Sequence, residues 1–380
     1  MRTLIGLLAG ISLLLCTCSE TIEAPQSMRL DLTVTVMDTT GFSEEISGSQ
    51  MIDSVAVFVN SISFQLFFEA LSNTGGLALF PEILPDVYNI SATRRIVQIQ
   101  DGVRLEKVMN GQLQNVEVYG EAAFVTIYME PTVLGQLLIS EIYYNGSPAD
   151  PIPYYFHDQF TEIYNNSDST LYLDSLIIAD AAHGSYEDDF THSVHAYMFP
   201  GSGKDYPLAP GEFVIVAQDA TNHAEYNKSS LDLSGADFEY YVKSTGDVDN
   251  PEVTNMIQLH HKYGVDFLYS VMSDAIVLVK VKDPYAYGYD TFNEILLPKS
   301  AILDGVDYRD NLTEVEYKRL DPSIDAGMTG GIDMYKGKSV ERRIDFYKGS
   351  RPILMDNNNS SIDFQVLNTP TPGWISGTEE

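Results

Sequence analysis

Two segments of the chain predict β-structure most clearly: LLISEIYYNG at residues 137–146 and FTEIYNNSDSTLYLDSLIIAD at residues 160–180. Both are rich in Ile, Leu, Phe and Tyr, which favour strands. In the second segment the sequence NNSDS at 165–169 separates one such run from another at 171–179. Asn, Asp and Ser stabilise turns by hydrogen-bonding the nearby backbone. The stretch therefore predicts three short strands with a β-hairpin turn at 165–169.

The rest of the chain repeats this pattern. Leucine and valine alternate with polar residues over 30–36, as in a half-buried strand. Several short strands separated by turn signals are typical of a β-sandwich, and 380 residues exceed the usual size of a single core. We expect an all-β fold with two sandwich domains in tandem, 28–131 and 132–376, joined by a hinge at 131–135. Further strands of the first domain are expected at 54–59, 63–68, 77–80, 87–93 and 117–128.

The first residues indicate the compartment. Arg2 precedes an apolar run at 4–15, which is shorter than the roughly 20 residues that cross a bilayer and is typical of a signal peptide. The sequence LCTC at 15–18 resembles a bacterial lipobox with Cys18 as the lipidated residue; an ordinary secretory signal is the alternative. We expect a signal peptide at 1–17, a tether at 18–27, and a lipid-anchored outer-membrane protein. It would face the periplasm or the cell surface. The acidic segment at 19–23 resembles a surface-export signal of Bacteroidetes lipoproteins, and this resemblance implies the surface.

Composition and missing motifs exclude several functions. The formal net charge of -32 repels phosphate backbones, so we expect no nucleic-acid partner. Both cysteines lie in the signal region, which excludes a cysteine nucleophile. The sequence has no G-x-S-x-G or H-E-x-x-H motif, and we expect structural roles for Glu141 and Glu162 within predicted strands. We therefore expect a protein without enzymatic activity.

Ligand binding is expected in three insertions of the second domain, 145–159, 180–205 and 218–272, because such long connections usually carry function or extra structure. The second insertion predicts a metal site: imidazole with carboxylate suits Zn or Fe, and carboxylates alone suit Ca. No Lys or Arg occurs between Lys107 and Lys204, so the local potential should attract cations. A solvated acidic loop is the alternative. The candidate ligands are Asp180, His183, Glu187, Asp188, Asp189, His192 and His195.

Tyrosine and histidine residues of the insertions form a second candidate surface. Tyrosine has an apolar body and a polar tip, which suit sugar or protein surfaces. Burial in the sandwich core is the alternative reading, since strands are naturally rich in tyrosine. The candidate binding residues are Tyr154, Tyr155, His223, Tyr240 and Tyr241.

Several motifs carry a family resemblance. The segment GGLALF at 75–80 with LPDVYNISA at 84–92 resembles carboxypeptidase-regulatory or prealbumin-like domains. ISEI at 139–142, FTEIYNN at 160–166 and LYLD at 171–174 resemble the bacterial lamin-tail domain, as do SVERR at 339–343, DNNNSS at 356–361 and TPTPG at 369–373. In combination they resemble Bacteroidetes lipoproteins of the DUF4876 type.

This resemblance implies two immunoglobulin-like sandwiches, the first a stalk and the second a binding module. It leads us to expect a lipid-anchored binding protein accessory to a TonB-dependent outer-membrane receptor. The alternative is a surface lipoprotein that captures a divalent metal. A metal-dependent hydrolase is a third and weaker expectation, because it also needs an open coordination position and a base.

Overall fold

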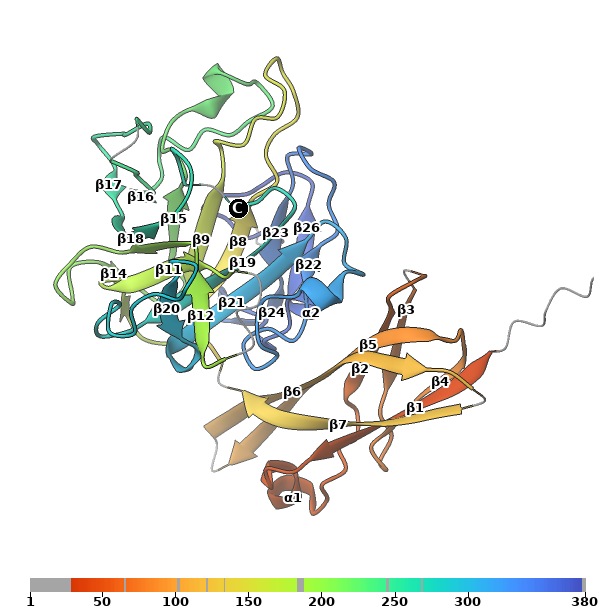
Figure 1. Cartoon of the computed structure of the whole chain (residues 1–380). Coiled ribbons are helices and arrows are strands. Elements are labelled where there is room, and N and C mark those ends of the chain that lie inside the picture. The colour runs from red at the N-terminus through yellow and green to blue at the C-terminus, as the bar shows by residue number, and fades with distance from the viewer. Residues whose placement is uncertain are drawn as a thin grey trace, which may run out of the picture.

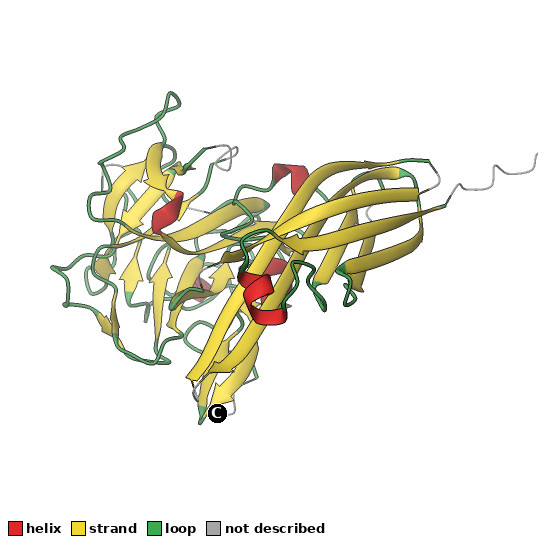
Figure 2. Ribbon diagram, turned by 90° about the horizontal axis from the view of Figure 1, so that it is seen from below, coloured by secondary structure: helices red, strands yellow, loops and turns green. Residues whose placement is uncertain are grey.

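A computed structural model describes residues 29–377 except 65, 101–102, 121, 133, 183–187, 244–245 and 268. The predicted signal peptide, the tether and Cys18 lie outside these residues. The described chain is almost entirely β, which confirms the all-β expectation, and its strands form two groups along the chain (Figures 1 and 2). Within the described residues, no helix has the length and hydrophobicity needed to cross a membrane.

The first group is one seven-stranded sheet in the order β3-β2-β5-β6-β7-β1-β4. The alternation over 30–36 behaves as predicted, because Leu30, Leu32, Val34 and Val36 are all buried and pack with β2, β4 and β5 in one core. The strand expected at 117–128 is instead the end of β6 and the start of β7, which are separated by a left-handed turn at Gly120. The elements are β1 (Leu30–Asp38), α1 (Phe42–Ser47), β2 (Ala56–Ser61), β3 (Phe67–Leu71), β4 (Leu77–Ile83), β5 (Asp86–Gln100), β6 (Val103–Val118) and β7 (Ala122–Thr132).

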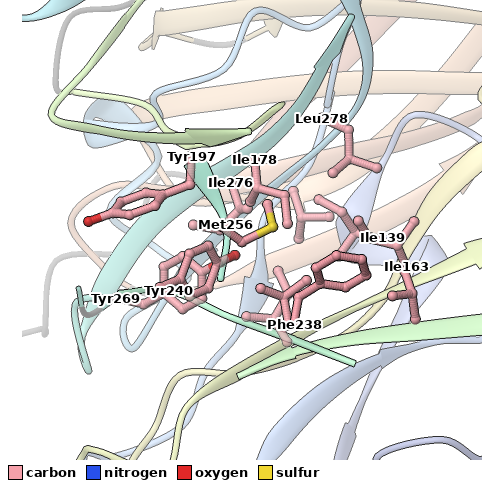
Figure 3. Close-up of a cluster of buried hydrophobic side chains, with 14 of the residues drawn as sticks. Ile139, Ile163, Ile178, Tyr197, Phe238, Tyr240, Met256, Tyr269, Ile276 and Leu278 are labelled. Carbon is pink, nitrogen blue, oxygen red and sulfur yellow. The ribbon is translucent and has the colours of Figure 1, made fainter. Parts of the chain in front are cut away.

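The second group is a sandwich of two main sheets. One has the order β17-β16-β15-β9-β8-β23-β26 and the other β18-β13-β11-β19-β21-β22. Figure 3 shows the core between them, where Ile139, Ile163 and Phe238 of the first sheet lie near Ile178 and Leu278 of the second. Three two-stranded ladders, β10-β14, β12-β20 and β24-β25, complete the domain.

The second group contains the following strands and short helices. The first sheet contains β8 (Leu137–Tyr143), β9 (Phe160–Asn165), β15 (Phe213–Ala217), β16 (Phe238–Glu239), β17 (Thr254–Asn255), β23 (Ser339–Arg342) and β26 (Phe364–Leu367). The second contains β11 (Leu176–Asp180), β13 (His195–Met198), β18 (Ile257–His261), β19 (Ser273–Lys280), β21 (Ile302–Arg309) and β22 (Thr329–Gly330). The ladders and short helices are β10 (Leu171–Tyr172), β12 (Phe190–Ser193), β14 (Pro207–Leu208), β20 (Ile295–Pro298), β24 (Ile344–Lys348), β25 (Arg351–Leu354), η1 (His223–Glu225), η2 (Lys299–Ala301), η3 (Val315–Tyr317) and α2 (Ser360–Asp363).

The prediction that the turn at 165–169 closes a β-hairpin is wrong, because the strands on its two sides do not pair with each other. The turn forms, with Ser167 N donating to Asn165 Oδ1 at 3.0 Å, but the hairpin pair is β8 with β9, before it. After the turn the chain crosses to the other sheet, where β11 pairs with β13 and β19. The strand expected at 171–179 is broken at Ser175, whose φ is 60°. All five residues of β11 are buried, so this strand requires neighbours on both faces rather than an exposed hairpin position.

The loop DNNNSS at 356–361 joins the two groups of strands. Asn110 Nδ2 of β6 donates to the carbonyls of Asn357 and Asn358, at 2.9 and 3.2 Å. Asn359 Nδ2 donates to Thr93 Oγ1 of β5 at 2.8 Å. In Figure 1 the adjoining helix α2 lies on the side of the second domain that faces the first. The first and third predicted insertions, 145–159 and 218–272, extend from other sides of this domain in Figure 1.

Candidate metal centre

Among the described candidate ligands of the second insertion, His192 and His195 have different carboxylate partners. Asp180 binds the chain where β13 begins. Its Oδ1 accepts from the amides of Val194 and His195, and its Oδ2 contacts His195 Nδ1 at 2.7 Å. Burial lowers the pKa of His195, but the bond to Asp180 outweighs it and the pKa is raised. His183 and Glu187 lie outside the described residues.

His192 has different partners from His195. Its Nε2 lies 2.8 Å from Asp188 and its Nδ1 2.8 Å from Asp290, and its strand β12 belongs to a separate ladder. Both ring nitrogens are thus engaged by carboxylates, and despite partial burial the pKa of His192 is raised. Glu294, whose carboxylate lies near the same ring, forms an ion pair with Lys262 at 2.9 Å. Asp189 is exposed. Of the predicted ligands, Asp188 and His192 thus form one ion pair and Asp180 and His195 another.

The tyrosine candidates separate into core and loop residues. Tyr240 is buried, with its hydroxyl 2.9 Å from that of Tyr269, and Tyr241 is partly buried in the following turn. Tyr154 is 71% exposed. Tyr155 and His223 are joined by a 2.7 Å bond between the Tyr155 hydroxyl and His223 Nδ1.

His223 links this pair to a cluster of acidic residues that sequence patterns did not indicate. Burial lowers its pKa to about 4, so the ring is neutral, with Nδ1 accepting from Tyr155. Its Nε2 then donates to the carbonyl of Asp219 at 2.9 Å. Asp219 in turn lies in a cluster with His157 and Asp266.

These three side chains place their ligand atoms within 4.8 Å of one another. His157 Nδ1 lies 2.9 Å from Asp266 Oδ2 and 3.8 Å from Asp219 Oδ2. The two aspartates are buried, at 4% and 6% exposure, whereas the His157 side chain is 44% exposed. The cluster therefore combines two buried carboxylates with one imidazole that is partly exposed to solvent.

Backbone pairing brings these distant residues together. Asp219 follows β15, His157 lies at the end of the first insertion, and Asp266 lies between β18 and β19. Gln218 N donates to the carbonyl of Gln159 at 2.8 Å, and Gln159 Nε2 donates to the carbonyl of Tyr269 at 3.0 Å. The two glutamines thus connect all three segments.

Three buried oxygen atoms of the cluster have no hydrogen-bond partner. They are Asp219 Oδ1, Asp266 Oδ1 and Gln218 Oε1. The amide of Gln218 is already used, since its Nε2 donates to Asp266 Oδ2 at 2.6 Å. An unsatisfied buried polar atom costs about 1–3 kcal/mol, so a group of three requires an explanation. A cation bound by Asp219 and Asp266 would offset the negative charge of these two buried carboxylates.

The electrostatics of the cluster favour the same ligand. Burial, followed by the charges of Asp266, Asp247 and Glu239, raises the pKa of Asp219 to about 9. Burial also raises the pKa of Asp247 to about 6, with Asp266 contributing. Among the described residues, no Lys or Arg forms an ion pair with Asp219 or Asp266. The excess negative charge is therefore balanced only by His157 or by bound protons.

The sequence pointed to these loops but not to these residues. His157 lies in the first predicted insertion, and Gln218, Asp219, Asp247 and Asp266 lie in the third. His157 and Asp266 are 109 positions apart, and neither belongs to a motif with ligand spacing. The available signal was the unusual length of both insertions.

A family model matches part of the chain. Residues 209–371 match the family "Protein of unknown function (DUF4876)". A crystal structure of a DUF4876 family protein from Bacteroides thetaiotaomicron VPI-5482 is similar in fold, with a TM-score of 0.58 and 23% identity over 92% of this chain and 98% of that one. The resemblance to DUF4876 proteins noted in the sequence is thus supported.

The remaining comparisons are distant. A putative adhesin from Bacteroides ovatus is 9% identical over 50% of this chain and 72% of that one, with a TM-score of 0.19, which is too low to argue from. No curated protein matches the chain.

Proposed function

We propose that this protein is a lipid-anchored surface protein that binds a divalent transition-metal ion at His157, Asp219 and Asp266. The observation that carries the proposal is the set of unpartnered buried oxygens around one half-exposed imidazole. The lamin-tail-like and prealbumin-like assignments of the two domains, the lipid anchor at Cys18 and the surface location belong to the same proposal and rest on the sequence.

The spacing of the ligand atoms suits a small ion. Two ligands about 2.0–2.1 Å from a tetrahedral zinc ion lie roughly 3.4 Å apart. The separations of His157 Nδ1 from Asp266 and Asp219, 2.9 and 3.8 Å, bracket that value. Small side-chain shifts would therefore complete the site, with Asp247 or Gln218 as a further oxygen ligand.

The donor set also selects a class of metal. Calcium takes six to eight oxygen ligands, whereas imidazole suits Zn and Fe. One imidazole with two or three carboxylates thus favours Zn²⁺, Fe²⁺ or Mn²⁺ over Ca²⁺. We assign capture rather than catalysis, because the carboxylates that would act as a general base are needed here as ligands.

The arrangement of the domains suits a capture role. The insertions that hold the centre extend from sides of the second domain other than the side that faces the first domain, which carries the N-terminal end of the described chain (Figure 1). A lipid at Cys18 would thus hold the centre away from the membrane. The receiving partner in this proposal is a TonB-dependent receptor, inferred from the type of lipoprotein that the sequence resembles.

Metal titration tests the proposal on the chain from residue 27, which contains every described residue. We expect about one equivalent of Zn²⁺ or Mn²⁺ to bind by calorimetry. Either Asp219→Asn or Asp266→Asn should weaken binding at least about 100-fold, because each removes a charged ligand from the ion.

Two controls make the result specific. Glu225→Gln removes one exposed carboxylate from the same insertion and should leave the affinity unchanged. His192→Ala with His195→Ala should also have no effect. Absence of a stoichiometric metal, or equal losses in Glu225→Gln and Asp219→Asn, would overturn the proposal.

A further inference from the structure

An apolar cavity of about 360 Å³ lies at the junction of the linker with the second domain. Its volume is within the roughly 300–1,000 Å³ of small-molecule sites. It is formed by the linker at 134–137, the short strand β10, the end of β19 and the start of β21. The side chains that shape it are Leu134, Leu137, Leu171, Tyr172, Ile302 and Leu303, with Lys280 at the edge.

The aliphatic wall of this cavity is incompletely covered by the protein. Leu134, Leu171 and Ile302 are only partly buried, and Leu303 is 36% exposed. These residues come from three separate segments and face one space. An apolar ligand would remove their remaining surface from water.

Lys280, an exposed lysine, brings a positive charge to the lining of the cavity. Its Nζ donates to the backbone carbonyls of Tyr172, at 3.5 Å, and of Asp174. It forms no ion pair with a carboxylate among the described residues. A lysine ammonium has three donors, so one N–H remains for a ligand. Partial burial lowers the pKa of Lys280, with Asp174 opposing the shift.

The nearby carboxylate is already occupied. Asp174 Oδ1 accepts from the amides of Gly203 and Asp205, both at 2.8 Å, and its Oδ2 accepts from Tyr206 N at 3.0 Å. Lys204, which does not line the cavity, places its Nζ 5.7 Å from the centre of the Tyr172 ring. The cavity therefore combines an apolar wall with a cationic edge, in a protein whose net charge is -32.

We propose that this cavity binds a free amphiphile with an aliphatic chain and a carboxylate head group. The chain would lie against Leu134, Leu171 and Leu303, and the carboxylate would accept from Lys280. A neutral lipid would leave Lys280 unpaired, and a cationic one would be repelled by it. This inference does not depend on the metal centre.

Calorimetric titration with a homologous series below its micelle concentration tests the proposal on the chain from residue 27. Affinity should rise from octanoate to decanoate by roughly fourfold for each added methylene. Decanol should bind at least about tenfold more weakly than decanoate, because it cannot form the charged hydrogen bond.

Substitutions separate the contribution of the Lys280 charge to binding from the contribution of the apolar wall. Lys280→Met keeps the aliphatic stem and should reduce decanoate affinity to that of decanol. Lys282→Met, at an exposed lysine two residues further on, is the matched control and should bind like the parent. Leu303→Asp should abolish binding of both ligands, and a circular dichroism spectrum and a thermal unfolding transition like those of the parent would show that this variant folds.

Several results would overturn the inference. They are no decanoate binding, equal affinity for decanol and decanoate, or equal effects of Lys280→Met and Lys282→Met. Binding of detergent-solubilised phospholipid but not of decanoate would also overturn it, because the occupant would then come from the membrane. None of these outcomes bears on the metal titration.

Discussion

At the scale of single residues, three buried glutamates play a part that the sequence only partly indicated. Glu141, Glu162 and Glu341 lie opposite one another on β8, β9 and β23. Each holds the C-terminal segment: Thr371 N donates to Glu141 at 3.1 Å, Gly373 N to Glu162 at 2.5 Å, and Ser376 N to Glu341 at 2.8 Å. Their contacts are with the chain itself, in keeping with the structural role expected for Glu141 and Glu162.

Two of these glutamates, Glu141 and Glu162, should make stability fall with rising pH. Burial raises the pKa of Glu141 to about 7, and burial together with the charge of Glu141 raises that of Glu162 to about 8. A carboxyl whose pKa is higher in the folded state stabilises the fold below its unfolded pKa, near 4.3. That contribution is lost as the pH rises through the folded value.

The variant Glu162→Gln measures this effect. Its free energy of unfolding, compared with the parent, should improve between pH 5 and pH 9, by up to about 1.4 kcal/mol per pH unit. Chemical denaturation at several pH values gives the slope. Glu117→Gln, at an exposed strand position, should leave it unchanged, and parallel curves for the parent and Glu162→Gln would contradict the assignment.

At the scale of elements, Ser175 decides where the chain changes sheets. Its left-handed backbone, with φ at 60°, separates β10 from β11, and its amide donates to the carbonyl of Phe199 at 3.1 Å. A β-carbon is unfavourable in this conformation. The crossover therefore carries a local strain that a glycine would relieve.

We expect Ser175→Gly to stabilise the protein by about 1 kcal/mol, because glycine adopts the left-handed region without steric cost. Thermal and urea unfolding measure the change. Ser175→Ala removes the hydroxyl but keeps the β-carbon, so it should give no gain. If Ala stabilises as much as Gly, backbone strain is not the cause.

At the scale of the whole molecule, the DNNNSS loop and one ion pair hold the two domains together. Arg95 Nη1 of β5 lies 2.6 Å from Asp345 Oδ2 of β24, and Asp356 Oδ2 accepts from Gly135 N of the linker at 2.8 Å. These contacts connect the first domain, the linker and the second domain directly. A tether at the N-terminus would thus hold two domains that are in direct contact with each other.

The proposed anchor gives the last prediction. Cys18→Ala should move the protein from the membrane fraction to the soluble fraction, because the lipid attached at this residue supplies the membrane affinity. Cys16→Ala is the matched control and should stay with the membrane. Fractionation followed by immunoblotting measures both variants, and membrane retention of Cys18→Ala would refute a lipid at this position.

Local patterns by themselves determined the class of fold and most of its strands. The alternation over 30–36 specifies a strand because a period of two places alternate side chains on one face. The runs at 137–143 and 160–165 do so because they are rich in residues that favour strands. Insertion lengths likewise indicated where a site should lie. These properties depend on neighbours in sequence, so they are visible without coordinates.

Only the tertiary structure decided which residues meet. It placed His192 between two carboxylates and paired Asp180 with His195. It also brought His157 close to Asp219 and Asp266, which are 62 and 109 positions away in the sequence. It also sent β11 to the opposite sheet. The physical reason is that ligand geometry and sheet membership are set by long-range pairing and burial, which no local spacing of residue types encodes.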